Sequence, residues 1–267
     1  MTTRKAPRSP SAGATLGRQV HGRLRELLVE GTLSPGEKVS LRTMAGRLGV
    51  SMQPVREAVA RLVADRALEV MPNRAVRVPI LTLEQFRELT AIRLAIEGFA
   101  AERAAAFHTR ADLAEMRRQE TAFRREGGSR APDLPAAVAA NHAFHFAVYR
   151  AAALPELLPI IEGLWLRIGP VLNLDLRSNV ARVRVGRAAG HHGALLSAIA
   201  RRDARAARKA LAADIEGAAR HIESCGVLPD NAVADAATAA RANVVPGAAT
   251  AAMARNPISR RRKQHGS

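Results

Sequence analysis

Apolar residues in the first eighty positions recur at helical spacing, and the spacing then changes to that of strands. Val20, Leu24, Leu27 and Leu28 fall on one face of a helix predicted over residues 16–30. After it, the pattern predicts helices over residues 41–48 and 52–64, and then a small β-hairpin built from residues 68–71 and 76–78.

From residue 83 onward the helical spacing continues almost without interruption. The predicted helices cover residues 83–107, 111–126, 134–152, 156–176, 180–201 and 204–225. The breaks between them are short, which is typical of an antiparallel bundle. The predicted fold is therefore mainly α, with an N-terminal winged helix-turn-helix that carries a small β-hairpin wing, followed by an all-α antiparallel helical bundle.

The pattern also divides the chain into four parts. Two of them, at the ends, have no periodic pattern and are expected to be disordered and basic. The expected parts are a basic arm over residues 1–14, a winged helix-turn-helix domain over 15–79, a helical-bundle domain over 80–229 and a basic tail over 230–267.

Charge narrows the class of partner. The 267 residues contain 41 Lys and Arg against 24 Asp and Glu, a formal net charge of +17. The first eighty residues alone carry 14 basic against 6 acidic side chains, which favours contact with a polyanion over an evenly solvated surface. No uninterrupted apolar run approaches a membrane span, and no secretory signal is present, so we expect a cytoplasmic protein without a membrane partner.

The segment before the hairpin has the chemistry of a DNA-reading helix. Gly49 allows a tight turn between two short helices, and Ser51 is placed as a helix N-cap. Gln53 and Arg56 follow near the start of the second helix, where a recognition helix meets base edges, and Arg74 lies at the hairpin tip. The alternative is a helical hairpin whose basic face is merely solvated.

Two runs in this segment resemble a known family. Residues 31–39 read Gly-Thr-Leu-Ser-Pro-Gly-Glu-Lys-Val, and residues 49–59 read Gly-Val-Ser-Met-Gln-Pro-Val-Arg-Glu-Ala-Val. Their order and spacing are similar to those of the GntR family of bacterial transcription regulators. The resemblance implies contacts with double-stranded operator DNA from Arg42, Ser51, Gln53, Arg56 and Arg74.

The sequence departs from the family pattern at two positions. Met52 stands where the family usually has Arg, which removes one contact to phosphate or guanine. Ala75 stands where the wing usually has Gly, which brings the tight wing turn into question. Both departures bear on which operator is read and how tightly it is bound, and neither removes the fold prediction.

The helical part contains a candidate metal site. Asn141 and His145 are four residues apart on one helix face, while His192 and Asp214 lie on later helices. Imidazole nitrogens with carboxylate and amide oxygens form a reasonable ligand set for a divalent metal such as Zn, Ni or Mn. The alternative is that these histidines are ordinary core or surface residues.

A helical bundle after such a DNA-binding segment also resembles the FadR-type ligand-binding (FCD) domain. Many such domains bind a metal through Asp, His, His and His, and the matching positions here are Asn141, His145, His192 and Asp214. One carboxylate is retained, so the formal ligand charge is preserved. The resemblance also implies a small organic-acid effector, for which Arg93 and Arg167 are candidates.

An alternative is open at Arg93, because Glu97 follows it at the spacing of a salt bridge within one helix. Cys225, the single cysteine, excludes an intramolecular disulfide and is expected to be inert.

The sequence as a whole predicts a ligand-responsive regulator, in the repressor sense common among similar proteins, that binds its operator as a homodimer. Two alternatives come from other classes. One is a metal-dependent enzyme that uses Asn141, His145, His192 and Asp214, for which no general base is apparent. The other is a nonspecific nucleic-acid-binding protein driven by the basic ends.

Overall fold

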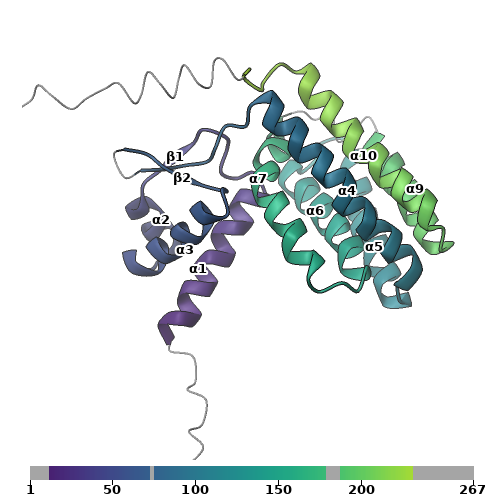
Figure 1. Ribbon diagram of the computed structural model, residues 1–267, viewed down its shortest axis with the longest axis horizontal. Coiled ribbons are helices and arrows are strands. Elements are labelled where there is room, and N and C mark those ends of the chain that lie inside the picture. Colours follow the sequence, from purple (N-terminus) through teal and green to yellow (C-terminus); the bar gives the residue numbers. More distant parts are fainter. Residues whose placement is uncertain (1–11, 73–74, 179–186, 231–267) are drawn as a thin grey trace, which may run out of the picture. The chain divides into compact units, whose positions relative to one another are not determined.

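The computed structural model describes residues 12–72, 75–178 and 187–230 (Figure 1). Several expectations fall outside these ranges: most of the basic arm, Arg74 at the wing tip, the start of the helix predicted over 180–201, and the basic tail beyond residue 230.

The N-terminal part contains three helices and a small sheet. In chain order these elements are α1 (Ala12–Val29), β1 (Lys38–Val39), α2 (Leu41–Leu48), α3 (Met52–Ala64), β2 (Glu69–Val70) and β3 (Val76–Arg77). The strands are antiparallel in the order β1-β3-β2, so the wing is a three-stranded sheet and not only the predicted hairpin. A strand of two residues leaves no alternating pattern, which is why β1 was not predicted. Helix α1 also begins at Ala12, before the predicted start at residue 16.

A shared core holds α1 against α3. The predicted apolar face of α1 is buried, with Leu24 and Leu28 almost fully covered. Val55 and Leu62 of α3 have no exposed surface, and Val59 is 5% exposed. This apolar face of α3 therefore packs inward and leaves the opposite face of the helix to solvent.

The helical part confirms the predicted series of helices among the described residues. They are α4 (Leu83–Phe107), α5 (Arg110–Gly128), α6 (Leu134–Ala151), α7 (Leu157–Ser178), α9 (Arg187–Ala200) and α10 (Ala204–Ser224). Side-chain caps fix several of their starts: Thr82 with Gln85 and Thr109 with Asp112 form capping boxes, and Asp203 caps α10. Helix α10 packs against α4 and α9, and α5 packs against α6, as Figure 1 shows.

Helix α7 is long and apolar enough, by length and composition alone, to cross a membrane. Its segment Leu157–Arg177 has a mean hydropathy of 1.3, and 44% of the apolar window is buried in the protein. The helix also contains Glu162 and Arg167, which interrupt the apolar run. Its buried residues Ile161 and Ile168 are core residues of the bundle, so we interpret α7 as a core helix.

Candidate functional site

The turn between α2 and α3 is built by a left-handed glycine. Ser40 caps α2 by accepting a hydrogen bond from the Thr43 amide at 3.0 Å. Gly49 ends the helix at φ 64°, and the amide of Val50 then donates to the carbonyl of Ala45 at 3.1 Å. A φ of 64° is a left-handed conformation, which glycine adopts without steric cost, so the expected role of Gly49 in the turn is confirmed.

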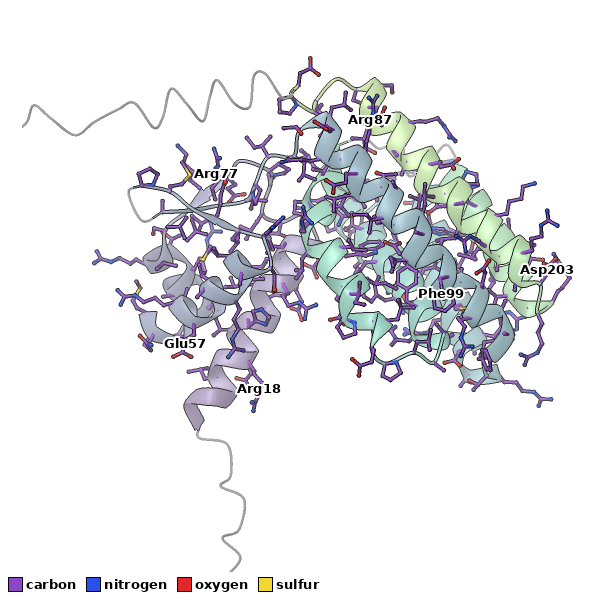
Figure 2. All side chains as sticks on the ribbon, viewed as in Figure 1. Arg18, Glu57, Arg77, Arg87, Phe99 and Asp203 are labelled. Atoms are coloured by element: carbon purple, nitrogen blue, oxygen red, sulfur yellow. The ribbon has the colours of Figure 1, made fainter. Side chains whose placement is uncertain are left out.

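The exposed face of α3 presents the expected DNA-reading residues. Ser51, Gln53 and Arg56 are all exposed at its N-terminal end. Ser51 is the N-cap residue, but its side chain makes no capping hydrogen bond. The amide nitrogen of Gln53 donates to Glu57 Oε1 at 3.1 Å, and Figure 2 labels Glu57 on this part of the molecule. Ser51 and Arg56 are thus open to solvent at the N-terminal end of α3, the end that contacts base edges in helix-turn-helix proteins.

The remaining expected DNA contacts are placed differently. Arg42 is exposed at the start of α2, and Arg74 lies outside the described residues. Met52 is partly buried and packs against the core, so the apolar residue that replaces the family arginine turns toward the protein. Ala75 is not among the described non-glycine residues with positive φ, so the wing carries no left-handed strain at this position.

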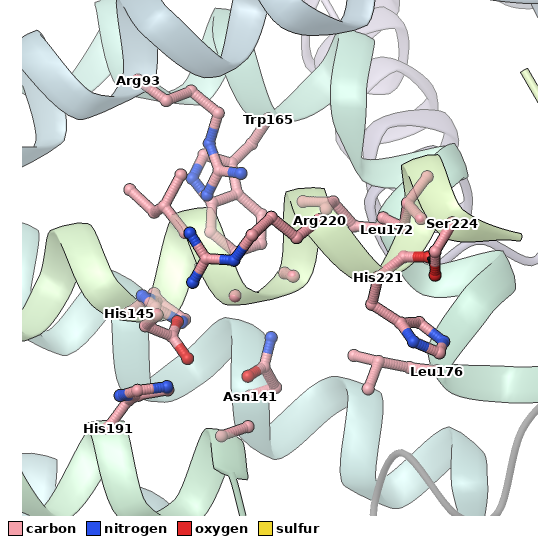
Figure 3. A pocket seen from close by; sticks show the side chains of 16 residues that line it. Arg93, Asn141, His145, Trp165, Leu172, Leu176, His191, Arg220, His221 and Ser224 are labelled. Atoms are coloured by element: carbon pink, nitrogen blue, oxygen red, sulfur yellow. Dashed lines mark hydrogen bonds and ion pairs between the residues drawn. The ribbon is translucent and has the colours of Figure 1, made fainter.

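A cavity of about 420 Å³ lies among the helices of the bundle. Arg93 of α4, Asn141 and His145 of α6, and Asp214 of α10 line it. Figure 3 shows Arg93 approaching from one side and Asn141 and His145 from another. The structure therefore brings three of the four expected metal-site residues to one cavity together with an expected effector-binding arginine. Arg167 is not among the residues that line this cavity.

The fourth expected ligand, His192 of α9, meets His145 and Asp214 just behind the cavity wall. His145 Nε2 lies 3.3 Å from Asp214 Oδ2, and His192 Nε2 lies 4.0 Å from the same oxygen. One donor atom from each of the three residues falls within 4.8 Å of the others. His145 is 2% exposed and His192 is fully buried. Three potential ligand atoms from three helices thus converge in a largely buried site beside the cavity.

A hydrogen-bonded chain fixes the orientation of His145. Arg93 donates to both carboxylate oxygens of Glu97, at 2.6 and 3.1 Å, and Tyr149 donates its hydroxyl hydrogen to Glu97 as well. The Tyr149 oxygen lies 3.3 Å from His145 Nδ1. Because the single hydroxyl hydrogen is used on Glu97, the Tyr149 oxygen accepts from Nδ1–H of His145. The other ring nitrogen, Nε2, is thereby turned toward Asp214 and His192.

Arg93 is therefore paired as well as placed in the cavity wall. The salt bridge to Glu97, left open by the sequence, is present, and both side chains are buried. Glu97 occupies the side-on edge of the guanidinium, formed by Nε and Nη2. The guanidinium also lies over the ring of Trp165, 5.0 Å from its centroid. These contacts hold the Arg93 head rigidly at the cavity wall.

Burial and neighbouring groups set the charge states of the converging residues. Burial lowers the pKa of His192 to about 3, although Asp214 opposes the shift. Burial would raise the pKa of Asp214, but the hydrogen bond with His145 and the nearby His192 outweigh it and lower that pKa to about 2. At neutral pH the site therefore combines a neutral imidazole with a carboxylate, which are the ionisation states that bind a metal.

The unpaired ring nitrogens of His192 are a further sign that these residues fit a divalent metal. Both ring nitrogens of His192 are buried and have no hydrogen-bond partner among the described residues. Unpaired buried polar nitrogens are costly, and a cation beside Nε2 would satisfy one of them. His145 Nε2 and Asp214 Oδ2, 3.3 Å apart, could both bind such a cation.

Three residues of the cavity were missed in the sequence. His191, Arg220 and His221 line it, and their side chains come from α9 and α10. His221 lies seven residues after Asp214, two helical turns along the same face, and this spacing was a usable signal. No comparable spacing singles out Arg220, which pairs with Glu216 at 3.3 Å.

Comparison with known proteins supplies the family. The family model described as "Bacterial regulatory proteins, gntR family" matches residues 16–78, and the model described as "FCD domain" matches residues 88–217. The chain is 36% identical over 155 residues to the "HTH-type transcriptional regulator McbR" of Escherichia coli (strain K12), covering 58% of this chain and 69% of that protein. It is also 32% identical over 101 residues to the "HTH-type transcriptional repressor RspR" of the same organism, covering 38% of this chain and 44% of that protein.

A solved structure agrees with the sequence relatives. The structure titled "E. coli McbR/YncC" superposes with a TM-score of 0.72 at 31% identity, covering 78% of this chain and 97% of that one. The expectation of a regulator, as opposed to a metal-dependent enzyme, agrees with what these relatives are. The exposed face of α3, the cavity in the bundle and both family matches lead to one conclusion: the chain belongs to the GntR family of DNA-binding transcriptional regulators and carries an FCD domain.

Proposed function

We propose that this regulator is a cytoplasmic homodimeric repressor whose operator binding responds to a small carboxylate bound with a divalent metal. The observation that carries the proposal is the convergence of His145, His192 and Asp214 behind a cavity that Arg93 also lines. A cavity of about 420 Å³ is of a size that holds a small ligand. Two copies of α3, related by a two-fold axis, would enter successive major grooves of a near-palindromic operator.

His145, His192 and Asp214 would hold the metal, with Asn141 as a further oxygen ligand from the cavity wall. The bound metal, of the Zn, Ni or Mn class, would supply a Lewis-acidic position for a carboxylate oxygen of the effector. Arg93 would present the remaining edge of its guanidinium to the effector, since Glu97 occupies only the side-on edge. Arg220, at the same cavity, is a better second cation than Arg167, which does not line it.

The DNA contacts we propose are Arg42, Ser51, Gln53 and Arg56, with Arg74 in the wing. Support for the first four is their exposure on α2 and α3. The repressor sense is supported by the name of the relative RspR, described as a transcriptional repressor.

The test is a DNA-binding titration at near-physiological salt. The probe is the intergenic DNA beside the gene of this protein, and the reference is a shuffled probe of equal length with excess competitor DNA. We expect a preference on the order of a thousandfold for the intergenic probe. A panel of small carboxylates, added with zinc, should then lower the affinity for that probe and leave binding to the shuffled probe unchanged.

Arg56→Ala should cost about 1–3 kcal/mol of operator binding and leave the helical circular-dichroism signal intact. The matched control is Arg61→Ala, which removes an exposed arginine from the last turn of the same helix. Equal losses for the two variants would show that charge and not position governs binding. Unchanged operator affinity of Arg56→Ala would remove this residue from the readout.

A further inference from the structure

A second group of metal-ligating side chains lies at the rim of the cavity. His221 Nε2 lies 3.1 Å from Asp175 Oδ1 and 3.6 Å from the sulfur of Cys225. One donor atom from each of the three residues falls within 4.8 Å of the others. None of these residues belongs to the group formed by His145, His192 and Asp214.

The distances from His221 Nε2 to Asp175 Oδ1 and to the Cys225 sulfur are close to those between two ligands of one zinc ion. Zinc binds thiolate sulfur at about 2.3 Å and imidazole nitrogen or carboxylate oxygen at about 2.0–2.1 Å, in tetrahedral geometry. Such ligands are about 3.6 Å apart for a sulfur–nitrogen pair and about 3.3 Å apart for a nitrogen–oxygen pair. The separations in this structure, 3.6 and 3.1 Å, are close to both values.

Hydrogen bonding alone explains this group poorly. Both partners approach the same ring nitrogen of His221, which carries at most one hydrogen. If that hydrogen is donated to Asp175, Nε2 has no lone pair with which to accept from the thiol of Cys225. A single cation between the three atoms would bind the imidazole nitrogen, the sulfur and Asp175 Oδ1 at once.

The fold explains why these residues meet. His221 lies in the last turn of α10 and Cys225 is the C-cap residue of the same helix, one turn later. Asp175 comes from the C-terminal half of α7, which packs against α10. His221 and Asp175 are partly buried and Cys225 is exposed, so the group is accessible from solvent. His221 and Ser224 also line the cavity.

We propose that Asp175, His221 and Cys225 form a second metal site, for a zinc-class divalent cation, at the rim of the cavity. The combination of sulfur, imidazole and carboxylate selects zinc-class ions over magnesium or calcium, which prefer oxygen ligands. Binding forms a metal–sulfur bond and releases the thiol proton of Cys225 to solvent. Three protein ligands leave a fourth coordination position for water or for an effector atom. The inference does not depend on the proposed repressor function.

Cobalt(II) tests the site in the full-length, metal-free protein, because only a thiolate ligand gives a sulfur-to-cobalt charge-transfer band in the near ultraviolet. We expect this band in the wild type and in the His145→Ala/His192→Ala variant, which retains the second group. We expect its loss in Cys225→Ser and in His221→Gln. Ser224→Ala is the matched control, since it alters the neighbouring rim residue and should keep the band.

Zinc should also protect Cys225, the single cysteine of the chain, from a thiol reagent. At a zinc concentration ten times the dissociation constant, the modification rate should fall roughly tenfold, because only the unbound fraction reacts. Asp175→Asn should weaken this protection without changing the rate in the absence of zinc. Cobalt spectra without a charge-transfer band, or a modification rate that zinc leaves unchanged, would overturn the proposal.

Discussion

Burial sets the charge state of single histidines in the bundle. Burial, helped by the neighbouring His145 and Arg150, lowers the pKa of His142 to about 4. The ring of His142 packs against Phe146, with centroids 4.2 Å apart, and against Trp165 at 5.4 Å. A histidine held among aromatic rings in this way is neutral in the folded protein over the whole physiological range.

This neutrality makes the stability of the metal-free protein dependent on pH. The unfolded chain has the ordinary histidine pKa near 6.5 and therefore binds more protons than the folded protein between pH 6.5 and 4. The free energy of unfolding should thus be level above pH 6.5 and fall as the pH is lowered toward 4, by roughly 3 kcal/mol at most for His142.

Urea denaturation at a series of pH values, with chelator present, measures this effect. His142→Gln, which cannot take up a proton in this range, should flatten the profile and leave a smaller slope from His192. Profiles of equal steepness for the wild type and His142→Gln would show that His142 is not held neutral.

Single residues also show what the sequence could and could not predict. His145, His192 and Asp214 were predicted together, and the structure brings them together. Tyr149 was predictable in principle, since it lies one turn after His145. Glu97 was not, because its link to Tyr149 depends on how α4 packs against α6. Sequence spacing identifies partners within a helix, but packing angles decide which partners meet between helices.

At the scale of elements, two glycines near the short turn between α2 and α3 lie in different backbone conformations. Gly49 has φ 64°, and nothing lies within 4 Å of the position where a Cβ would be. Gly46 is inside α2 with ordinary helical geometry, is exposed, and also has open space at its Cβ position. An added Cβ would meet no neighbour at either position, so alanine substitutions at the two glycines differ only in the backbone conformation that alanine must adopt.

Gly49→Ala should destabilise the protein by about 1–2 kcal/mol, because an L-residue in left-handed geometry is strained. Gly46→Ala should stabilise it by about 0.5–1 kcal/mol, because alanine has the higher helix propensity. Thermal and urea denaturation of both variants measure these differences. Changes of the same sign would contradict the assignment of strain to Gly49.

The helices were predictable because each has many periodic apolar positions and most begin at a recognisable cap. The wing was only half predictable. Strands β2 and β3 follow from alternating residues, whereas β1 consists of Lys38 and Val39 alone and is defined by its pairing with β3. A strand of two residues is defined by its hydrogen bonds to the neighbouring strand and is too short to show an alternating pattern in the sequence.

At the scale of the whole molecule, α7 connects the two regions that regulation must link. Leu172 of α7 lines the cavity. The next residue, Asn173, is 1% exposed and donates a hydrogen bond to the carbonyl of Val29, the last residue of α1. Arg25 of α1 also pairs with Glu162 of α7 at 2.7 Å. A helix that lines the cavity is therefore hydrogen-bonded to the DNA-binding part.

Metal bound by the bundle should consequently stabilise the whole folded chain. In a Cys225→Ser background, which isolates the buried site, zinc at a hundred times its dissociation constant should raise the free energy of unfolding by about 2.7 kcal/mol. The His145→Ala/His192→Ala variant in the same background should lose both this gain and stoichiometric metal. His191→Ala, beside the site but outside the three-residue group, is the control. Zinc that neither binds nor stabilises the Cys225→Ser protein would contradict the buried site.

The exposed sulfur of Cys225 gives this regulator a practical property. The chain contains one cysteine, which is exposed and lies close to His221 and Ser224 of the cavity lining. A maleimide fluorophore would therefore attach at this single point without any other cysteine having to be mutated. We expect the brightness of such a dye to change with the polarity of its surroundings when an acid of the proposed effector class binds in the cavity. The labelled protein could therefore be used to screen a library of acids for binding by fluorescence, before any operator is known.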